Sequence, residues 1–155
     1  MGKGGSKELY REFKKRFELP EFEIIDKELE VSAMDGDKFL LRTIRGKIKS
    51  RLENYCNMIE DLLSPDTSIP LLHECTFVTE RSKARMLNLY KKLMYMLRMA
   101  DHLEVEKSTA KDARYIKGYF DHLEMVQREM KTITTTRMNA WKKDLASYIK
   151  EEYFG

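Results

Sequence analysis

The chain has 155 residues, of which 42% are hydrophobic and 35% are charged, and its formal net charge is +3. These proportions are typical of an ordered protein with a core and exclude a disordered chain, while so small a net charge does not by itself indicate a nucleic-acid partner. Two cysteines are too few for a disulfide framework, and no apolar run approaches the roughly 18 residues of a membrane span. We therefore expect a single cytoplasmic domain over residues 1–155, outside any membrane.

The first predicted helix is short and covers residues 7–17. Ser6 is a suitable N-cap, and Leu9, Phe13 and Phe17 fall on one helical face. Pro20 then ends the pattern, because proline cannot continue a helix from its interior. Between residues 21 and 34 the helical spacing weakens, and no element is predicted there.

Two interpretations compete for residues 29–44. Asp35-Gly36 is a turn signal, so the stretch could form a β-hairpin; alternatively, Asp37 caps a helix that begins at Lys38. The helix is preferred because apolar residues keep a three–four spacing from residue 41 to residue 62, and a strand gives no reason for that spacing. We therefore predict a main helix over about residues 37–63.

Residues 65–78 are predicted to form a connection that is apolar rather than polar. Connections of this length are usually functional or are packed down as lids. Its apolar side chains, which require cover, are Ile69, Leu71, Leu72, Phe77 and Val78.

Two further main helices are predicted at about 80–103 and 108–149. Thr79 is the expected cap of the first, and Thr109 with Asp112 in the first turn marks the start of the second. At 1.5 Å per residue the last helix would be about 60 Å long. The expected fold is therefore all-α: an up-and-down helical bundle with one unusually long C-terminal helix.

The residue pattern offers no recognisable catalytic or metal-binding constellation. There is no G-x-S-x-G motif, no glycine-rich phosphate loop and no C-x-x-C pair. His73, Glu74 and Cys75 are the densest group of donor residues, but three adjacent residues rarely converge on one ion. We therefore predict a protein that is not an enzyme, with no catalytic residue, no cofactor and no bound metal.

Two basic stripes are the candidate polyanion-binding sites. Basic residues on the helix over 37–63 are spaced four, three and four apart, and a second set recurs on the helix over 80–103. If both stripes share an outer face, they form a ridge that could follow a phosphate backbone; otherwise they are ordinary solvated faces. The residues are Lys38, Arg42, Arg45 and Lys49 on the first helix and Arg81, Arg85 and Lys92 on the second.

One family resemblance follows from the order of the motifs. A short helix, Leu19-Pro20, a basic helix with Leu-Arg-Thr-Ile-Arg at 41–45, and Tyr-Lys-Lys-Leu at 90–93 loosely resemble the helical half of GINS subunits of the replication complex. The resemblance covers about residues 8–100, and the small β-domain of that family has no counterpart after Glu104. We take no site or activity from it.

The end of the long helix carries the candidate self-association site. The helix over 80–103 is too short to cover the helix over 108–149 beyond about Met130, so the following apolar stripe needs another partner. Either the apolar connection covers it, or a second copy of the chain does so across a twofold axis. The stripe consists of Met138, Trp141, Leu145, Tyr148 and Ile149.

These observations favour a non-catalytic helical interaction or scaffold protein. The expected partner is a second copy of the chain, with the connection helping to cover the same surface, or another protein. The alternative is a nucleic-acid-associated module that uses the two basic stripes.

Overall fold

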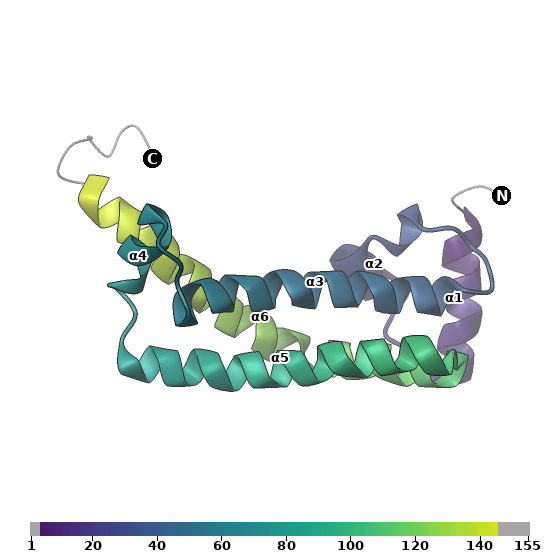
Figure 1. Ribbon diagram of the computed structural model, residues 1–155. Coiled ribbons are helices and arrows are strands. Elements are labelled where there is room, and N and C mark those ends of the chain that lie inside the picture. The colour runs from purple at the N-terminus through teal and green to yellow at the C-terminus, as the bar shows by residue number, and fades with distance from the viewer. Residues whose placement is uncertain (1–3, 146–155) are drawn as a thin grey trace. The chain divides into compact units, whose positions relative to one another are not determined.

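The computed structural model describes residues 4–145, and over that range the chain is all-α, with six α-helices, one short 3₁₀ turn and no strand (Figure 1). The elements are α1 (Gly4–Phe17), α2 (Phe22–Leu29), the 3₁₀ turn Val31–Ala33, α3 (Leu40–Leu63), α4 (Ile69–Cys75), α5 (Glu80–Glu106) and α6 (Thr109–Leu145). None of these helices combines the length and the apolar composition needed to cross a bilayer.

The predicted all-α fold with an unusually long last helix is confirmed. Helix α6 has 37 residues in the described part of the chain, which corresponds to about 55 Å. The capping residues differ slightly from those expected: the Ser108 hydroxyl, one residue before Thr109, accepts from the backbone N–H of Lys111 at 3.3 Å. Thr79 caps α5 as predicted, because its hydroxyl accepts from the backbone N–H of Ser82 at 3.1 Å.

The hairpin alternative for residues 29–44 is wrong. Residues 31–33 form a 3₁₀ turn, and α3 begins at Leu40. Asp37 acts at the start of this helix, since its carboxylate accepts from the backbone N–H of Phe39 at 2.8 Å. A helix that starts at this cap places the apolar residues, which are spaced three and four apart, on one face. A strand would have divided them between its two faces.

Helix α2 was not predicted. Phe22, Ile25 and Leu29 are spaced three and four apart and are all buried, so the helical pattern is present but is only two turns long. Helix α1 also begins earlier than expected, at Gly4, which places the buried Ser6 inside the helix rather than at its cap.

The connection over residues 65–78 contains a helix that was also not predicted. Ser68 is its N-cap, with its hydroxyl accepting from the backbone N–H of Leu71 at 3.4 Å, and Pro70 lies in the first turn, where a missing N–H costs nothing. Helix α4 therefore occupies the middle of the segment, and only its flanks are loop.

Three helices of the described chain end in a residue with left-handed backbone conformation that is not glycine. Glu18 follows α1, Glu30 follows α2 and Lys107 follows α5, each with φ near 55°. At Glu30 and Lys107 the backbone N–H returns to a carbonyl of the last turn, at 2.8 and 2.9 Å. This conformation stops each helix and turns the chain.

The chain divides into two compact units. Unit 1 consists of Met1–Glu53 and Met94–Glu124, and unit 2 consists of Asn54–Leu93 and Met125–Gly155. Each of the three long helices contributes residues to both units. The expectation of a single domain stays a prediction.

Unit 1 contains α1, α2 and the first half of α3, and an ion pair between Glu28 and Arg51 at 3.1 Å joins α2 to α3. The Tyr10 hydroxyl donates to the carbonyl of Pro20 at 2.5 Å, and Glu28 of α2 accepts from the Tyr119 hydroxyl at 2.9 Å. The backbone of α1 also touches the loop before α3, because a Cβ atom on Gly36 would lie 2.4 Å from the carbonyl carbon of Gly5. A glycine is therefore required at residue 36.

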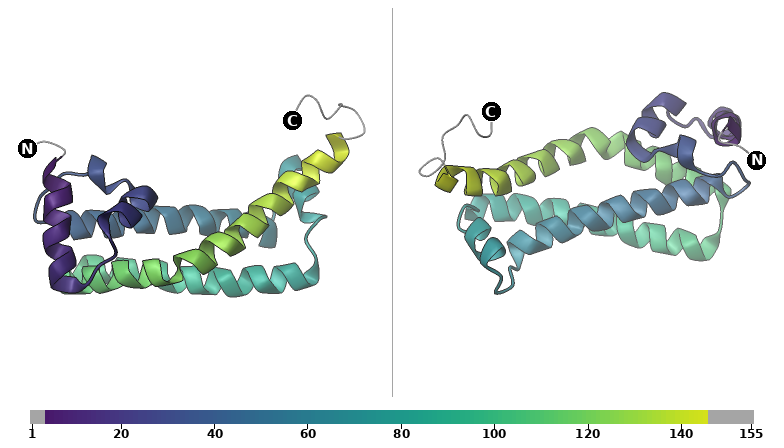
Figure 2. Two further views of the ribbon diagram at one scale, coloured as in Figure 1. Left: turned by 180° about the vertical axis from the view of Figure 1, so that it is seen from behind. Right: turned by 90° about the horizontal axis from the view of Figure 1, so that it is seen from above.

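Unit 2 packs α4 beside the end of α6. Its core includes Ile59 and Leu62 from α3, Leu93 from α5, and Met130 and Ile133 from α6. Figures 1 and 2 show α4 next to the last turns of α6 in every view. The connection therefore contacts α6, but through His73 and Glu74, whereas its apolar side chains Ile69 and Leu72 stay exposed rather than covered, contrary to the expectation from the sequence.

Candidate interaction surface

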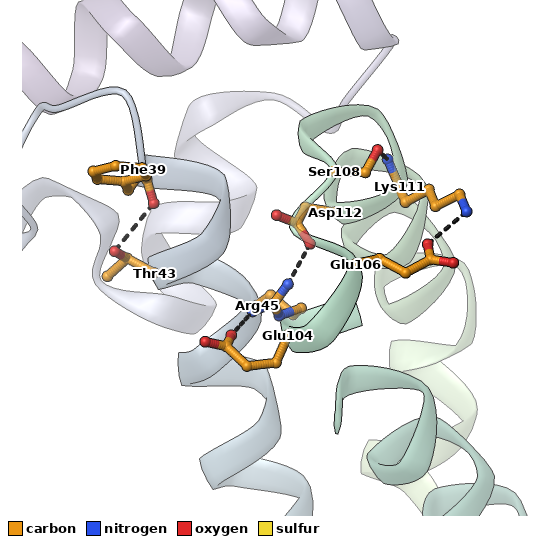
Figure 3. Close-up of polar contacts among 8 residues, drawn as sticks. All are labelled: Phe39, Thr43, Arg45, Glu104, Glu106, Ser108, Lys111 and Asp112. Carbon is orange, nitrogen blue, oxygen red and sulfur yellow. Dashed lines mark hydrogen bonds and ion pairs between the residues drawn. The ribbon is translucent and has the colours of Figure 1, made fainter. Parts of the chain in front are cut away.

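Arg45 is not part of an exposed basic stripe on α3 (Figure 3). Its side chain is buried, and its guanidinium donates to an oxygen of Asp112 at 2.5 Å and to an oxygen of Glu104. Asp112 is buried as well, whereas the Glu104 side chain is 62% exposed. Arg45 therefore neutralises a buried carboxylate inside unit 1 and is not available to a polyanion, contrary to the prediction.

The groups around Arg45 are perturbed in a way that fits a structural role. Burial raises the pKa of Asp112 above the usual range of an aspartate, and the charge of Arg45 acts in the opposite direction. Nearby, burial raises the pKa of the Tyr115 hydroxyl, which donates to the backbone carbonyl of Met96 at 3.0 Å. Each of these groups has a hydrogen-bond partner within unit 1, which is typical of a structural network.

The other three residues of the first predicted stripe are also engaged within unit 1: Lys38, which precedes α3, and Arg42 and Lys49 on α3. Lys49 lies 2.6 Å from a carboxylate oxygen of Asp101, and this hydrogen bond raises the pKa of Lys49 and lowers the pKa of Asp101. Lys38 and Arg42 lie over the ring of Phe39, at 5.0 and 4.6 Å from its centroid. The α3 residues thus do not form a free row of cations.

The second basic stripe lies on the part of α5 that belongs to unit 2. Arg81, Arg85 and Lys92 are all exposed. Arg85 donates to both carboxylate oxygens of Glu129 on α6, at 3.0 and 3.2 Å. The two predicted stripes belong to different units, and the idea that they form one ridge stays a prediction.

Glu74 is the centre of the contact between α4 and α6. Its carboxylate is buried and accepts from Arg137 at 3.0 Å and from the indole N–H of Trp141 at 2.7 Å. Arg137 also reaches Asp61 of α3 at 3.6 Å. One carboxylate therefore holds two side chains of α6 in fixed positions through charge-assisted hydrogen bonds.

The two residues adjacent to Glu74 in the sequence contact different helices. The His73 ring lies 4.4 Å from the Trp141 ring, centroid to centroid, and its Nε2 atom lies 3.1 Å from the carbonyl oxygen of Ala140. The Cys75 thiol instead donates to the carbonyl of Leu62 on α3 at 3.4 Å, and burial raises its pKa. The three adjacent donors therefore do not converge, and the described residues contain no group of three that could hold a metal ion.

The predicted self-association stripe is partly exposed. Met138 is 61% exposed, and Trp141 and Leu145 are each 38% exposed. Tyr148 and Ile149 lie outside the described residues. On the neighbouring helix α4, Ile69 and Leu72 are exposed as well, at 80% and 50%. Unit 2 thus carries large apolar side chains that the described residues leave partly exposed.

A small hollow also lies in unit 2, between α5 and α6. Its volume is about 50 Å³, well below the roughly 300–1,000 Å³ of typical ligand pockets. Its lining combines apolar side chains with the Arg85–Glu129 ion pair and the hydroxyls of Thr132 and Thr136. Both threonines donate to backbone carbonyls of the preceding turn, which leaves them poorly suited to activate a substrate.

Comparisons of the chain with protein-family models, with curated protein sequences and with solved structures found no match. The resemblance to GINS subunits therefore gains no support from them.

Proposed function

We propose that this chain is a non-catalytic cytoplasmic interaction protein that forms a homodimer through the last turns of α6. The observation that carries the proposal is the exposed apolar stripe of Met138, Trp141 and Leu145, which recur at three and four residues along one face. Full burial of a large apolar side chain contributes about 1.5–3 kcal/mol relative to full exposure, so covering the exposed part of each of these side chains would gain a fraction of that value. Cys56 and Cys75 are not joined by a disulfide, which is in keeping with a reducing compartment.

The anchored tryptophan supports this choice of surface. Trp141 is held from one side by its hydrogen bond to Glu74 and its contact with His73, so its orientation is fixed before any partner binds. Side chains ordered in advance lose less conformational entropy on association. Tryptophan is also enriched among the residues that contribute most to protein interfaces.

Light scattering and sedimentation of the chain at about 100 μM test the proposal, because a dimer with a micromolar dissociation constant would be nearly complete there. We expect a dimer for the unmodified chain and a monomer for Met138→Glu. Met138 is a sharper choice than Trp141, since Trp141→Glu would also place a second carboxylate beside Glu74. The control is Val105→Glu, which changes an 81% exposed residue of unit 1 and should leave the dimer intact. A monomeric unmodified chain would refute the proposal.

A second candidate function is binding to a polyanion through α5. It is favoured by the exposure of Arg81, Arg85 and Lys92, which are spaced four and seven residues apart and therefore lie along one stripe. Between residues 81 and 100 this helix carries no acidic residue. Binding of a labelled DNA duplex by the unmodified chain, and its loss in the triple variant Arg81→Glu, Arg85→Glu, Lys92→Glu, would support this function.

A further inference from the structure

Helix α4 is attached to unit 2 in an unusual manner. It has seven residues, all of which the structure describes, and among them Glu74 is the one that is buried. Two of its three aliphatic side chains, Ile69 and Leu72, are instead exposed, at 80% and 50%, and the third, Leu71, is only half-buried. A helix held by the hydrophobic effect would show the reverse arrangement, with aliphatic side chains inside and the carboxylate in water.

The attachment to α6 is concentrated in two adjacent residues. Glu74 accepts from Arg137 and Trp141, and His73 contacts Trp141 and the carbonyl of Ala140. On the other side, the contact with α3 includes the weak hydrogen bonds from the Cys75 thiol. A seven-residue helix is not stable alone, so α4 is ordered only as long as these contacts persist.

We propose that α4 is a reversible strap that covers part of the apolar stripe of α6 and opens without unfolding of the rest of unit 2. In the stripe it covers one side of Trp141, and beside the stripe it contacts the carbonyl of Ala140, a residue that is fully buried. Opening the strap would extend the surface formed by Met138, Trp141 and Leu145 towards Ala140. The strap therefore limits association with a second copy, a regulatory role that rests on the proposed function.

Hydrogen exchange of the unmodified chain tests the strap directly. Amides of local openings exchange at rates that do not depend on denaturant, whereas amides protected by global unfolding exchange faster as denaturant is added. We expect the amides of α4 to exchange at rates that do not depend on denaturant. One of them is the amide of Leu72, which donates to the carbonyl of Ser68 at 3.1 Å. The amides of α5 around Leu89 should exchange faster as denaturant is added. Exchange of both sets through one global unfolding reaction would overturn the strap.

Substitution of Glu74 by glutamine provides a second test. Arg137 and Trp141 donate to different oxygens of the Glu74 carboxylate, and glutamine replaces one of these two oxygens by an NH2 donor, so it cannot accept at both positions. Glu74→Gln should therefore shift the population towards the open strap. The matched control is Glu80→Gln, which makes the same change at an exposed residue that pairs with Lys83.

The readout is fluorescence quenching by acrylamide, because Trp141 is the one tryptophan of the sequence. The indole is already 38% exposed, so we expect Glu74→Gln to raise the quenching constant by up to about twofold, while Glu80→Gln leaves it unchanged. Circular dichroism of both variants verifies that the long helices persist. Because the proposed dimer would itself cover Trp141, the quenching is measured at a dilution at which both variants are monomeric. Equal quenching in the two variants under that condition would overturn the strap.

Light scattering of the same variants separates the strap from the proposed function. Increased quenching together with tighter association in Glu74→Gln supports the regulatory role. Increased quenching with unchanged association shows a strap that does not limit dimer formation, which overturns that role. A chain that stays monomeric with the strap closed or open refutes the proposed homodimer, while the exchange and quenching results still decide the strap.

Discussion

Arg45 and Asp112 are joined by a 2.5 Å hydrogen bond between two buried side chains that lie 67 positions apart in the chain. Each charge loses its hydration on folding, at a cost of several kcal/mol, and the partner's charge offsets that cost. Removing one partner alone should therefore lower the free energy of unfolding more than removing both. The pair fixes which surface of α3 faces the start of α6 in unit 1.

Replacing Arg45 alone should destabilise the chain strongly. Arg45→Met leaves the carboxylate of Asp112 buried without its partner, and we expect a loss of about 3–5 kcal/mol in the free energy of unfolding. The double variant Arg45→Met, Asp112→Leu removes both charges and should recover most of that loss. Urea denaturation of the two variants measures the difference.

The third member of this network provides the control. Glu104 also bonds to Arg45, but its side chain is 62% exposed, so water screens the interaction. Glu104→Gln should therefore change the unfolding free energy by no more than about 1 kcal/mol. A loss as large as that of Arg45→Met would contradict the assignment of Asp112 as the principal partner.

Asp101 and Asp112 should titrate on opposite sides of the ordinary aspartate pKa of about 3.9. The hydrogen bond from Lys49 lowers the pKa of Asp101, whereas burial raises that of Asp112. Carboxyl NMR resonances followed against pH measure both. Lys49→Gln should return the pKa of Asp101 towards the ordinary value and leave that of Asp112 unchanged.

The two shifts have opposite consequences for stability. The pKa of Asp101 is lower in the folded chain, so its contribution is present above the ordinary pKa and is lost as the pH falls through the lowered one. The pKa of Asp112 is higher in the folded chain, so its contribution decreases as the pH rises from the ordinary pKa through the raised one. The free energy of unfolding of Asp101→Asn and of Asp112→Asn is measured at several pH values between those limits. In Asp101→Asn the stability should no longer fall as the pH falls, and in Asp112→Asn it should no longer fall as the pH rises.

Two glycine-to-alanine substitutions should change stability in opposite directions. A Cβ atom at residue 36 would lie 2.4 Å from the backbone of Gly5, so Gly36→Ala forces α1 away and should cost about 1–3 kcal/mol. Gly46 lies inside α3 with open space around it, so Gly46→Ala should stabilise the chain by about 1 kcal/mol. Thermal unfolding compares the two, and a stabilising Gly36→Ala would refute the close approach.

Any binding of duplex DNA by α5 should depend strongly on salt. Three phosphate contacts, from Arg81, Arg85 and Lys92, give a log–log slope of about −2.7, which is a loss of about 40-fold in affinity between 50 and 200 mM salt. Fluorescence anisotropy of a labelled duplex measures the slope. Binding that does not change with salt would exclude these residues as its source.

The long helices could be predicted because their evidence is local. The three–four spacing along α3, α5 and α6 continues over many turns, so a single glycine such as Gly46 does not hide it. Helices α2 and α4 have eight and seven residues, which is too few turns for the spacing to be decisive. At α4 the remaining signal was the Ser68 cap followed by Pro70 in the first turn.

The roles of Arg45 and Glu74 could not be predicted, because their partners are distant in sequence. Arg45 fits a basic stripe with Arg42 and Lys49, yet it also lies one residue from the buried Ile44, at the edge of the apolar face. Only the position of Asp112 decides which surface it joins. Likewise, Glu74 becomes buried only because Arg137 and Trp141, more than 60 residues away, converge on it.

The left-handed residues after α1, α2 and α5 leave this protein below the highest stability that its fold allows. Glu18, Glu30 and Lys107 adopt with a full side chain a conformation that glycine adopts freely, at a cost of about 1 kcal/mol each. All three positions belong to unit 1, so glycine at each would add thermal tolerance there without altering a core contact. A laboratory evolution experiment that selects for heat resistance should therefore recover glycine at these helix ends early, and independently of any change in the surface of α6.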